Sequence, residues 1–504
     1  MTLVGYHAGK AMFFFLIGAF FLIGSGVFAE RARGDLNEIV SGFEDQENSK
    51  AFEIGPDEAI DGFDESTEDK ADQPNNTLDT FDRESGEIVA KDARNSQSPD
   101  LPDLTGSIGL SSAYNLRSHR APPFTIDLDG FSRLRTRAEL QADFSLPSSW
   151  RARISGHIFH DWVYGILDRN NFTHDLLDEN ETEVELGETY ILGRLGPDID
   201  LKFGRQIVVW GTSESLRVTD VVNPMDRREP GVVDIEDLRL PVAMTRIDYY
   251  FNNQWGITGL AIHELRPDKE PPFGSDFFPG ALPQPKRDMP DFSFKNQEWA
   301  MALTGRLTGW DLSLHGAWMF DDSFYLDSVN QGIVRRSHAR VAMVGGTVQV
   351  ARGNWLIKAE GALLKGLKHS NLPDHKKSRI DLLAGLEYNG FRDMTITFEA
   401  VNRHILDYDD RLQGLPDDLD ENEFQGILRI VKSFYHETLH LTLLASAFGI
   451  AGKGGAFERA QIEYDWTDDL SVILGAVFYQ GGDKSFLESI EDNDRLFAEL
   501  KYSF

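Results

Sequence analysis

The 504-residue chain contains no cysteine, has 50 basic residues against 82 acidic ones, and carries a single long apolar run. The absence of cysteine excludes a disulfide framework and thiolate metal sites. A formal net charge of −32 argues against nucleic acid or anionic lipid as a partner, since both bind basic surfaces. Beyond the N-terminus, no stretch approaches the roughly 20 apolar residues that a membrane-spanning helix needs.

The single apolar run covers residues 11–23 and follows a short segment that carries His7 and Lys10. It ends a few residues before Ala29, which suits the cleavage site of a secretory signal peptide. An uncleaved N-terminal anchor is the alternative, but the run is short for a spanning helix. We therefore predict a signal peptide over residues 1–29 and export of the remaining chain.

The C-terminus has the pattern of a membrane strand. Period-two alternation that ends in an aromatic residue is typical of the closing strand of an outer-membrane β-barrel, although an amphipathic edge strand of a soluble sheet has the same pattern. Together with the export signal, it predicts the bacterial outer membrane as location. We expect outer-membrane lipid as a partner, and the barrel-assembly machinery as a second one that recognises this strand. The apolar side of the strand carries Leu496, Ala498, Leu500, Tyr502 and Phe504.

Residues 101–504 alternate in the same way over about 400 residues, which a soluble sandwich of short strands does not sustain. The composition, 41% hydrophobic, suits strands with one face to lipid and one to a wet lumen. The fold class is therefore all-β, a transmembrane antiparallel β-barrel. Eight short turns imply about 18 strands, and a count of 16 stays open because residues 404–460 are weakly patterned. The short turns are expected near Pro147, Gly196, Asn252, Thr308, Gly353, Asn389, Tyr435 and Thr467.

Longer connections alternate with the short turns, as expected for a barrel with tight periplasmic turns and longer outer loops. These loops are expected at residues 165–181, 210–240, 267–294, 321–336, 365–378 and 404–425.

Residues 30–100 form an acidic tail with 21 acidic and 7 basic residues. So few apolar residues cannot form a core, and we expect the tail to be disordered in the periplasm. Phe43, Phe63 and Phe81 each stand directly before an acidic residue in a recurring pattern. The tail is either a solvated tether or a set of short motifs that dock a periplasmic carrier, with the phenylalanines as anchors.

The segment 203–250 is the most distinctive part of the chain. It holds an arginine–glutamine pair at Arg205, a tryptophan–glycine pair at Trp210, and an aspartate-x-x-asparagine-proline-x-aspartate element that starts at Asp220. On these elements, residues 101–504 resemble an outer-membrane barrel family known as domain of unknown function thirteen hundred and two. The resemblance implies a transport barrel, often encoded beside a resistance-nodulation-division type pump and a periplasmic carrier. It implies no particular substrate and no catalytic residues.

The same segment predicts a long, charged loop between two strands. Long loops are usually functional or disordered, and lumen plugs are common in large barrels. We expect the loop either to fold inward as a constriction, pairing with charges of the wall, or to remain a solvated outer loop. The candidate residues of the constriction are Arg205, Trp210, Arg217, Asp220, Asn223, Asp226, Arg227, Arg228, Asp234, Glu236, Asp237 and Arg239.

Arginines on two predicted strands point to one lumen face. They form either a positive wall opposite the acidic loop, which selects solutes by charge, or a set neutralised by neighbouring acids. The acids in question are Glu139, Asp143, Glu183 and Glu185, and the arginines are Arg133, Arg135, Arg137, Arg151 and Arg153.

No catalytic, metal or cofactor motif stands out. His263-Glu264 lacks the second histidine of a zinc-protease helix, and Ser213 lacks the second glycine of a nucleophile elbow. We therefore expect no cofactor, no catalytic residues and no metal site. The sequence favours an outer-membrane channel for small amphipathic or hydrophobic solutes, which works with a periplasmic carrier and an inner-membrane pump. The alternatives are a lipid-modifying enzyme of the outer membrane and a closed structural or adhesion barrel.

Overall fold

The computed structural model describes residues 102–117, 130–233, 238–280, 282–291, 293–329 and 333–504. The signal peptide, the acidic tail with its three phenylalanines, and the loop acids Asp234, Glu236 and Asp237 lie outside the described residues.

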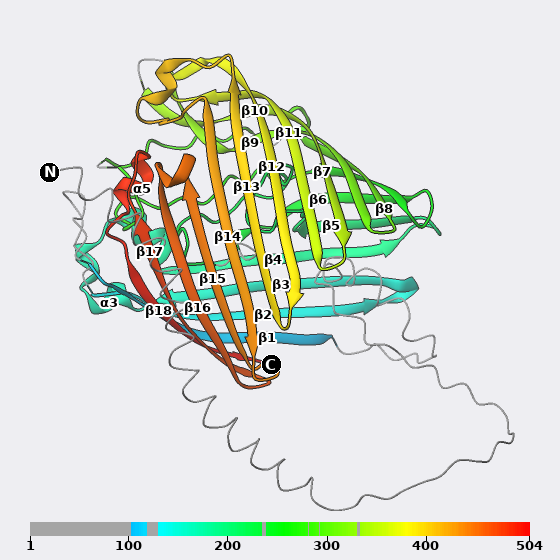
Figure 1. Ribbon diagram of the computed structural model, residues 1–504, viewed down its shortest axis with the longest axis horizontal. Helices are drawn as coiled ribbons and strands as arrows, with labels where there is room; N and C mark the ends of the chain where they lie inside the picture. The colour runs from blue at the N-terminus through cyan, green and yellow to red at the C-terminus, as the bar shows by residue number, and fades with distance from the viewer. Residues whose placement is uncertain (1–101, 118–129, 234–237, 281, 292, 330–332) are drawn as a thin grey trace, which may run out of the picture. The chain divides into compact units, whose positions relative to one another are not determined.

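The described chain forms one closed antiparallel barrel (Figure 1). Each strand pairs with the next, and β18 pairs with β1 from Ser107 opposite Ser503 to Asn115 opposite Arg495. The prediction of 18 strands is confirmed, and the alternative count of 16 is wrong. The strands are β1 Asp103–Asn115, β2 Gly130–Leu146, β3 Trp150–Asp161, β4 Thr182–Arg194, β5 Ile199–Gln206, β6 Val242–Tyr250, β7 Trp255–Ile262, β8 Glu298–Leu307, β9 Trp310–Val329, β10 Ile333–Arg352, β11 Trp355–His369, β12 Leu372–Phe391, β13 Met394–Leu406, β14 Asn422–Phe434, β15 Leu439–Phe448, β16 Gly455–Thr467, β17 Leu470–Gln480 and β18 Arg495–Ser503.

The two faces of the strands differ as the alternation predicts. On β1, Leu104, Ile108 and Leu110 are each about half exposed on the outer face. An outer apolar band of this kind is what lipid requires of a barrel, and aromatic residues belong at its rims. At the rim with the short turns, the exposed aromatic residues include Tyr249, Phe251, Trp310, Trp355, Phe391, Tyr464, Trp466, Tyr502 and Phe504.

The strand ends agree with most predicted turns and correct three details. The turn expected near Asn389 lies three residues later, at Arg392-Asp393. The loops expected at 321–336 and 365–378 are largely strand, because β9, β10 and β12 each have 20 residues and β11 has 15. A strand of 9–11 residues already crosses a membrane, so these strands extend beyond it, where polar residues replace the apolar pattern.

Short helices lie in the loops opposite the short turns. They are α3 Val163–Ile166 and α4 His174–Asn180 between β3 and β4, and α5 Ser485–Ser489 between β17 and β18. Thr173 caps α4, since its hydroxyl accepts a hydrogen bond from the Leu176 amide. None of the described helices is long and apolar enough to cross a membrane.

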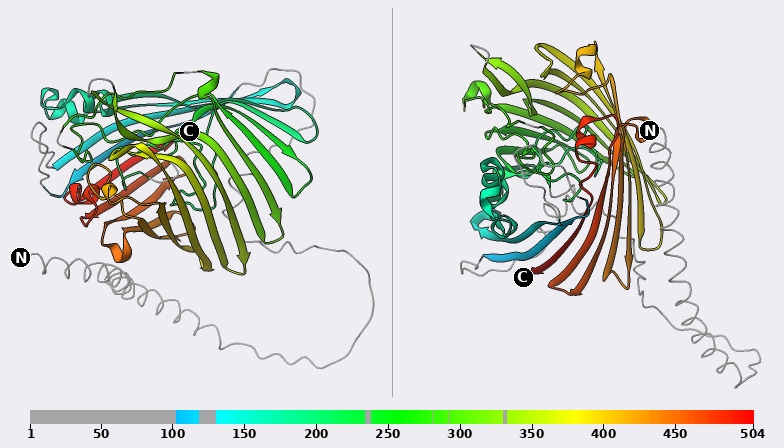
Figure 2. Two further views of the ribbon diagram at one scale, coloured as in Figure 1. Left: turned by 90° about the horizontal axis from the view of Figure 1, so that it is seen from above. Right: turned by 90° about the vertical axis from the view of Figure 1, so that its left-hand side faces the viewer.

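Two loops fold into the barrel (Figure 2). The β5–β6 loop, residues 207–241, packs Val208, Trp210, Leu216, Val218 and Val222 against inward side chains of the wall in one buried apolar cluster. The β7–β8 loop, residues 263–297, buries Phe277 beside Tyr479 and Val477 of β17, in a cluster that also takes in Val232. The buried apolar core of this barrel therefore lies in its lumen, where the two loops pack against the wall.

Candidate functional site

The tip of the β5–β6 loop is held by one buried carboxylate of β11. Glu360 accepts hydrogen bonds from the backbone amides of Thr212 at 2.5 Å, Ser213 at 2.8 Å and Thr219 at 3.3 Å. The hydroxyls of Thr212 and Thr219 donate to the same carboxylate at 3.1 and 3.0 Å. Hydrogen bonds to an ionised acceptor are the stronger ones, so this carboxylate is a main anchor of the loop.

Two further wall strands hold the same tip. Glu399 of β13 accepts from the Ser213 hydroxyl at 2.6 Å and from the Ser215 amide at 3.3 Å. Glu214 of the loop pairs with Lys358 of β11 at 3.3 Å and with Arg429 of β14 at 3.1 Å. We call Glu360 and Glu399 the wall latch, because these two carboxylates receive the donors of residues 212–219.

The aspartate-x-x-asparagine element closes the base of the loop. Asn223 donates to the carbonyls of Gln206 at 3.1 Å and Leu240 at 2.9 Å, and its own oxygen accepts from the Val208 amide at 2.8 Å. This side chain is fully buried and joins the two ends of the loop. The amide fits here because one side supplies two donor hydrogens and the other an acceptor.

Asp220 collects the charged residues of the same base. It accepts from Arg239 at 3.0 Å and from the Trp210 amide at 3.2 Å, and it pairs with Arg217 at 3.3 Å. Trp210 packs at 4.8 Å between ring centres against His315 of β9. The distinctive segment therefore folds as one internally bonded unit.

The second half of the β5–β6 loop pairs with β4. Arg228 pairs with Asp226 at 2.5 Å and with Glu183 of β4 at 3.0 Å. Burial alone would raise the pKa of Asp226, but the bond from Arg228 outweighs it and lowers the pKa below its ordinary value. Arg227 points elsewhere and pairs with Asp268 of the β7–β8 loop at 3.1 Å.

The arginines of β2 and β3 divide into two groups. Arg133 pairs with Glu229 of the β5–β6 loop, and Arg135 lies 3.5 Å from the same carboxylate. Arg135 also lies 3.4 Å from Asp161 of β3, and the remaining arginines that form pairs use acids of the wall. Arg137 pairs with Glu139 at 2.6 Å, Arg153 pairs with Asp143 at 2.8 Å, and Arg151 stands opposite Ser145 in the register.

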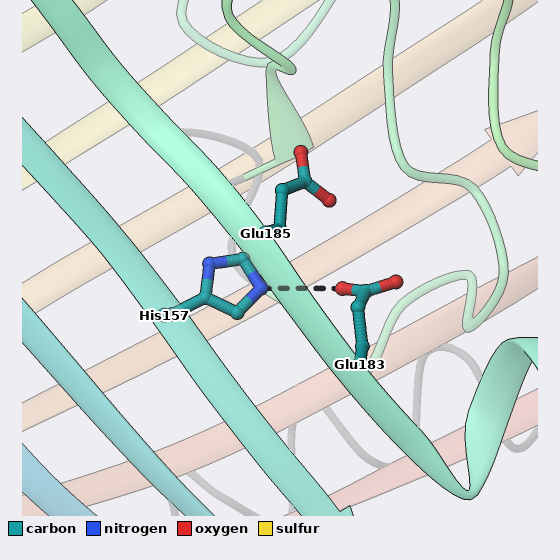
Figure 3. Close-up of side chains that lie close together, drawn as sticks. All are labelled: His157, Glu183 and Glu185. Atoms are coloured by element: carbon teal, nitrogen blue, oxygen red, sulfur yellow. Dashed lines mark hydrogen bonds and ion pairs between the residues drawn. The ribbon is translucent and has the colours of Figure 1, made fainter.

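One group of potential metal ligands lies on β3 and β4 (Figure 3). Ligand atoms of His157, Glu183 and Glu185 lie within 4.8 Å of one another. Both carboxylates are already paired with Lys269 of the β7–β8 loop, at 2.8 and 2.5 Å. Because Lys269 supplies the positive charge that a cation would bring, the group fits an anchor for the loop better than a metal site.

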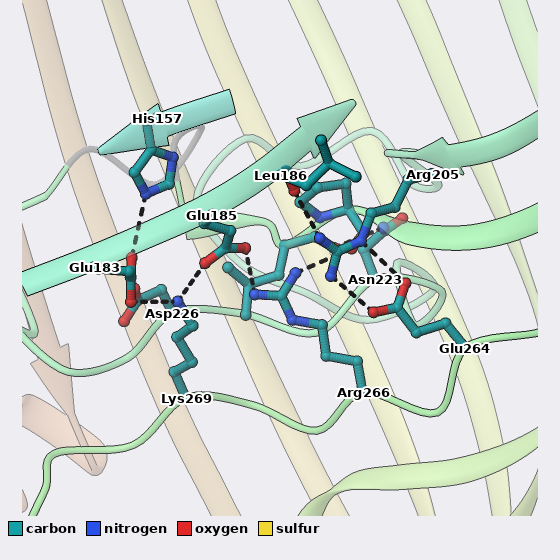
Figure 4. Close-up of polar contacts among 12 residues, drawn as sticks. His157, Glu183, Glu185, Leu186, Arg205, Asn223, Asp226, Glu264, Arg266 and Lys269 are labelled. Carbon is teal, nitrogen blue, oxygen red and sulfur yellow. Dashed lines mark hydrogen bonds and ion pairs between the residues drawn. The ribbon is translucent and has the colours of Figure 1, made fainter. Parts of the chain in front are cut away.

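A second set of ion pairs continues this anchor along β4 and β5 (Figure 4). Arg266 pairs with Glu185, and Arg205 of β5 binds Glu264 with two hydrogen bonds at 3.0 and 2.7 Å. Arg205 also donates to the Leu186 carbonyl at 2.6 Å. These contacts attach the β7–β8 loop to the wall through side chains.

The sequence identified the β5–β6 loop as a candidate but did not identify the wall residues that hold it, Glu360 and Glu399. The inward row of β11 reads Leu356, Lys358, Glu360, Ala362 and Leu364, so two charges interrupt an apolar row that faces the lumen. These two charges in an inward apolar row are a sequence signal from which the contact with the loop could have been predicted. The β7–β8 loop was expected to lie outside, and its Glu264 was considered only as part of a metal motif.

The model of a family described as "Protein of unknown function (DUF1302)" matches residues 126–504. No curated protein sequence matches the chain.

Among solved structures, Pseudomonas aeruginosa OccK11 (OpdR) is similar at 10% identity and a TM-score of 0.44, with 81% of this chain and 99% of that chain covered. Pseudomonas aeruginosa OccK2 (OpdF), crystallised with glucuronate, is similar at 12% identity and 0.45, with coverages of 80% and 98%. A loop-deletion mutant of OmpT, an outer-membrane protein of Vibrio cholerae, is similar at 10% and 0.39, with 80% and 100% covered.

Proposed function

The chain belongs to the DUF1302 family, as its motifs predicted, and we propose that it is a channel of the bacterial outer membrane for small solutes with apolar surface. The outer face supports this location, because it carries an apolar band and a rim of aromatic residues. Both ends of the barrel, at Asp103 and Ser503, lie at the rim with the short turns, so we propose that this rim faces the periplasm.

The observation that carries the proposal is the apolar inner wall. The lumen of a water-filled pore is polar, yet the inward residues of several neighbouring strands here are hydrophobic. A solute with an apolar body loses less by entering such a lumen than a fully hydrated sugar does. The inward hydrophobic residues include Leu260 of β7, Val341 and Met343 of β10, Leu364 of β11 and Val401 of β13.

Passage requires that the β5–β6 loop move away from this wall. The loop covers the apolar residues and is held by the wall latch, Glu360 and Glu399. These contacts are hydrogen bonds and ion pairs between side chains and a loop, so they can part while the barrel keeps its strand ladders. A solute that competes for the apolar wall favours the released loop.

We propose that the barrel works together with a periplasmic carrier and an inner-membrane pump. The tail, with Phe43, Phe63 and Phe81, docks a periplasmic carrier that exchanges solute with the barrel. Several weak contacts on one tether raise the local concentration of the carrier without holding it permanently.

Planar-bilayer recording tests the channel. We expect discrete conductance steps from the purified barrel, which the amphipathic acid cholate reduces and glucose at the same concentration does not. If neither the wild-type barrel nor a variant with a weakened wall latch, such as Glu360→Gln, gives conductance steps, the channel function is rejected. In that case, labelling by a serine-reactive probe would favour a lipid-modifying enzyme, and no labelling would favour a closed structural barrel.

A further inference from the structure

One stretch of the barrel wall lacks a strand-to-strand ladder. On its β3 side, β4 is paired from Thr182 onward. On its β5 side, the ladder includes only Thr189–Arg194. The first half of β4 therefore has an open edge, because β5 ends at Gln206 and the chain turns inward as the β5–β6 loop.

The gap continues past the ends of β5 to β8 that lie opposite the short turns. These four strands have 8 to 10 residues, whereas β9 and β10 have 20. The β8–β9 ladder ends at Trp299 opposite Trp318, and beyond it β9 pairs with β10 alone. The β7–β8 loop crosses the gap, since Lys269 reaches β4 and the Asp288 amide donates to the carbonyl of Arg336 on β10 at 2.8 Å.

The outward face at the open edge of β4 continues an apolar row of the neighbouring strands. Val184 stands opposite Ile158, which stands opposite Ala138, which stands opposite Ile108. Ile158 and Ile108 are 49% and 51% exposed on the outer face, and Val184 is 77% exposed. A backbone edge without a neighbouring strand is costly in lipid unless side chains bond it, as Arg205 does at the Leu186 carbonyl, or it lines a cavity that admits polar groups.

Such a cavity lies directly behind the edge. It has a volume of about 510 Å³, and Val184, Leu186 and Met289 form its apolar side. Its other side holds the paired cations described above and Arg287 of the β7–β8 loop. The Nε of Arg287 is buried and has no hydrogen-bond partner among the described residues. The cavity thus joins an apolar side to the guanidinium of Arg287, whose buried Nε does not itself open into it.

We propose that this cavity is a lateral port, which binds an amphipathic acid with its headgroup on Arg287 and passes it sideways through the gap between β4 and β9. This proposal rests on the channel function, for which it names the solute class and the exit. The apolar body of the acid lies against Leu186 and Met289. The pairs of Glu185 with Lys269 and Arg266 close the port. Opening it separates side chains and breaks no strand ladder.

Binding of dodecanoate to the purified barrel tests the headgroup site. We expect Arg287→Gln to weaken binding about tenfold, because a charge-assisted bond is lost. Lys286→Gln, an exposed cation on the same segment, should bind as the wild type does, and dodecanol should bind equally to all three. Equal dodecanoate affinity in wild type and Arg287→Gln would overturn the proposal. Heat-modifiable migration on a gel confirms that each variant is folded.

A reversible cross-link across the port tests whether the acid passes sideways through it. The chain has no cysteine, so Glu185→Cys with Arg266→Cys can be joined by a short cleavable bis-maleimide. In a Gram-negative host without its own barrel for long-chain acids, the bridge should abolish dodecanoate uptake, and cleavage should restore it. Unchanged uptake through a bridged barrel would overturn the port. Ion conductance is measured on the same protein, so failure of the channel and failure of the port are read separately.

Discussion

The Ser213 hydroxyl donates a hydrogen bond to Glu399 across 2.6 Å, although the two residues are 186 positions apart in the sequence. The contact joins the tip of an inward loop to a strand on the wall of the barrel. With Glu360, it makes the position of the β5–β6 loop depend on two carboxylates that are buried in the lumen. Changes at these two residues should therefore alter the loop without altering the barrel.

Replacing Glu360 by glutamine should release the tip of the loop. The amide NH₂ of glutamine would face donors of Thr212, Ser213 or Thr219, where a carboxylate oxygen now accepts. Leaving buried donors unpaired costs about 3 kcal/mol, which shifts the docked-to-released ratio about a hundredfold. We expect a larger conductance with longer open times in planar bilayers.

The control for this variant is Glu437→Gln, at an exposed position of the turn between β14 and β15. It changes the net charge equally and should leave conductance at the wild-type value. Wild-type conductance in a folded Glu360→Gln barrel would show that this carboxylate does not hold the loop in place.

Asn223→Asp should loosen the base of the loop. The new carboxylate would face the carbonyl oxygens of Gln206 and Leu240, both of which now accept hydrogen bonds. We expect a loss of about 3 kcal/mol in docking of the loop and faster cleavage by trypsin at Arg217 and Arg239. Asn354→Asp, in the turn between β10 and β11, is the matched control. Equal cleavage rates in the two variants would count against the role of Asn223.

The pair of Asp226 and Arg228 should stabilise the protein across the neutral range. Because the pKa of Asp226 is lowered in the folded state, its contribution is present above the ordinary carboxyl pKa and is lost as pH falls through the lowered value. The difference in thermal midpoint between wild type and Asp226→Asn should stay constant from pH 7 to 5 and shrink below about pH 4. A difference that vanishes by pH 5 would contradict this assignment.

Substituting Phe43, Phe63 and Phe81 together by alanine should abolish capture of a periplasmic partner by the tail while barrel assembly is unchanged. Capture by the wild-type tail should also weaken with salt, since exposed acids act through screened fields. If wild-type and triple-mutant tails recover the same proteins in a pull-down, the tail is a tether alone.

Local alternation was enough to predict the barrel. The arginines predicted on two neighbouring strands lie on β2 and β3, and the short turns lie at or near their predicted residues. Alternation failed where strands leave the membrane, as in β9 and β10. There both faces meet water or protein, so residues 321–336 carry turn-like polar residues although they are largely strand.

The site could be predicted only in part, because its two sides come from distant segments. The charges and unusual length of the β5–β6 loop are local signals, and they marked Asp220 and Asn223. Glu360 and Glu399, which bind the loop, are single carboxylates in ordinary strands. Their role in holding the loop depends on which loop contacts them. That pairing is set by three-dimensional packing and has no counterpart in sequence spacing.

Deletion of residues 212–236 tests the central claim most directly. The deletion removes Leu216, Val218 and Val222 from the lumen together with every donor to the wall latch. With heat-modifiable migration to confirm folding, single-channel recording in planar bilayers should show a conductance several times that of the wild type. A folded deletion variant with unchanged conductance would contradict the account, because it would mean that this loop does not restrict the path through the barrel.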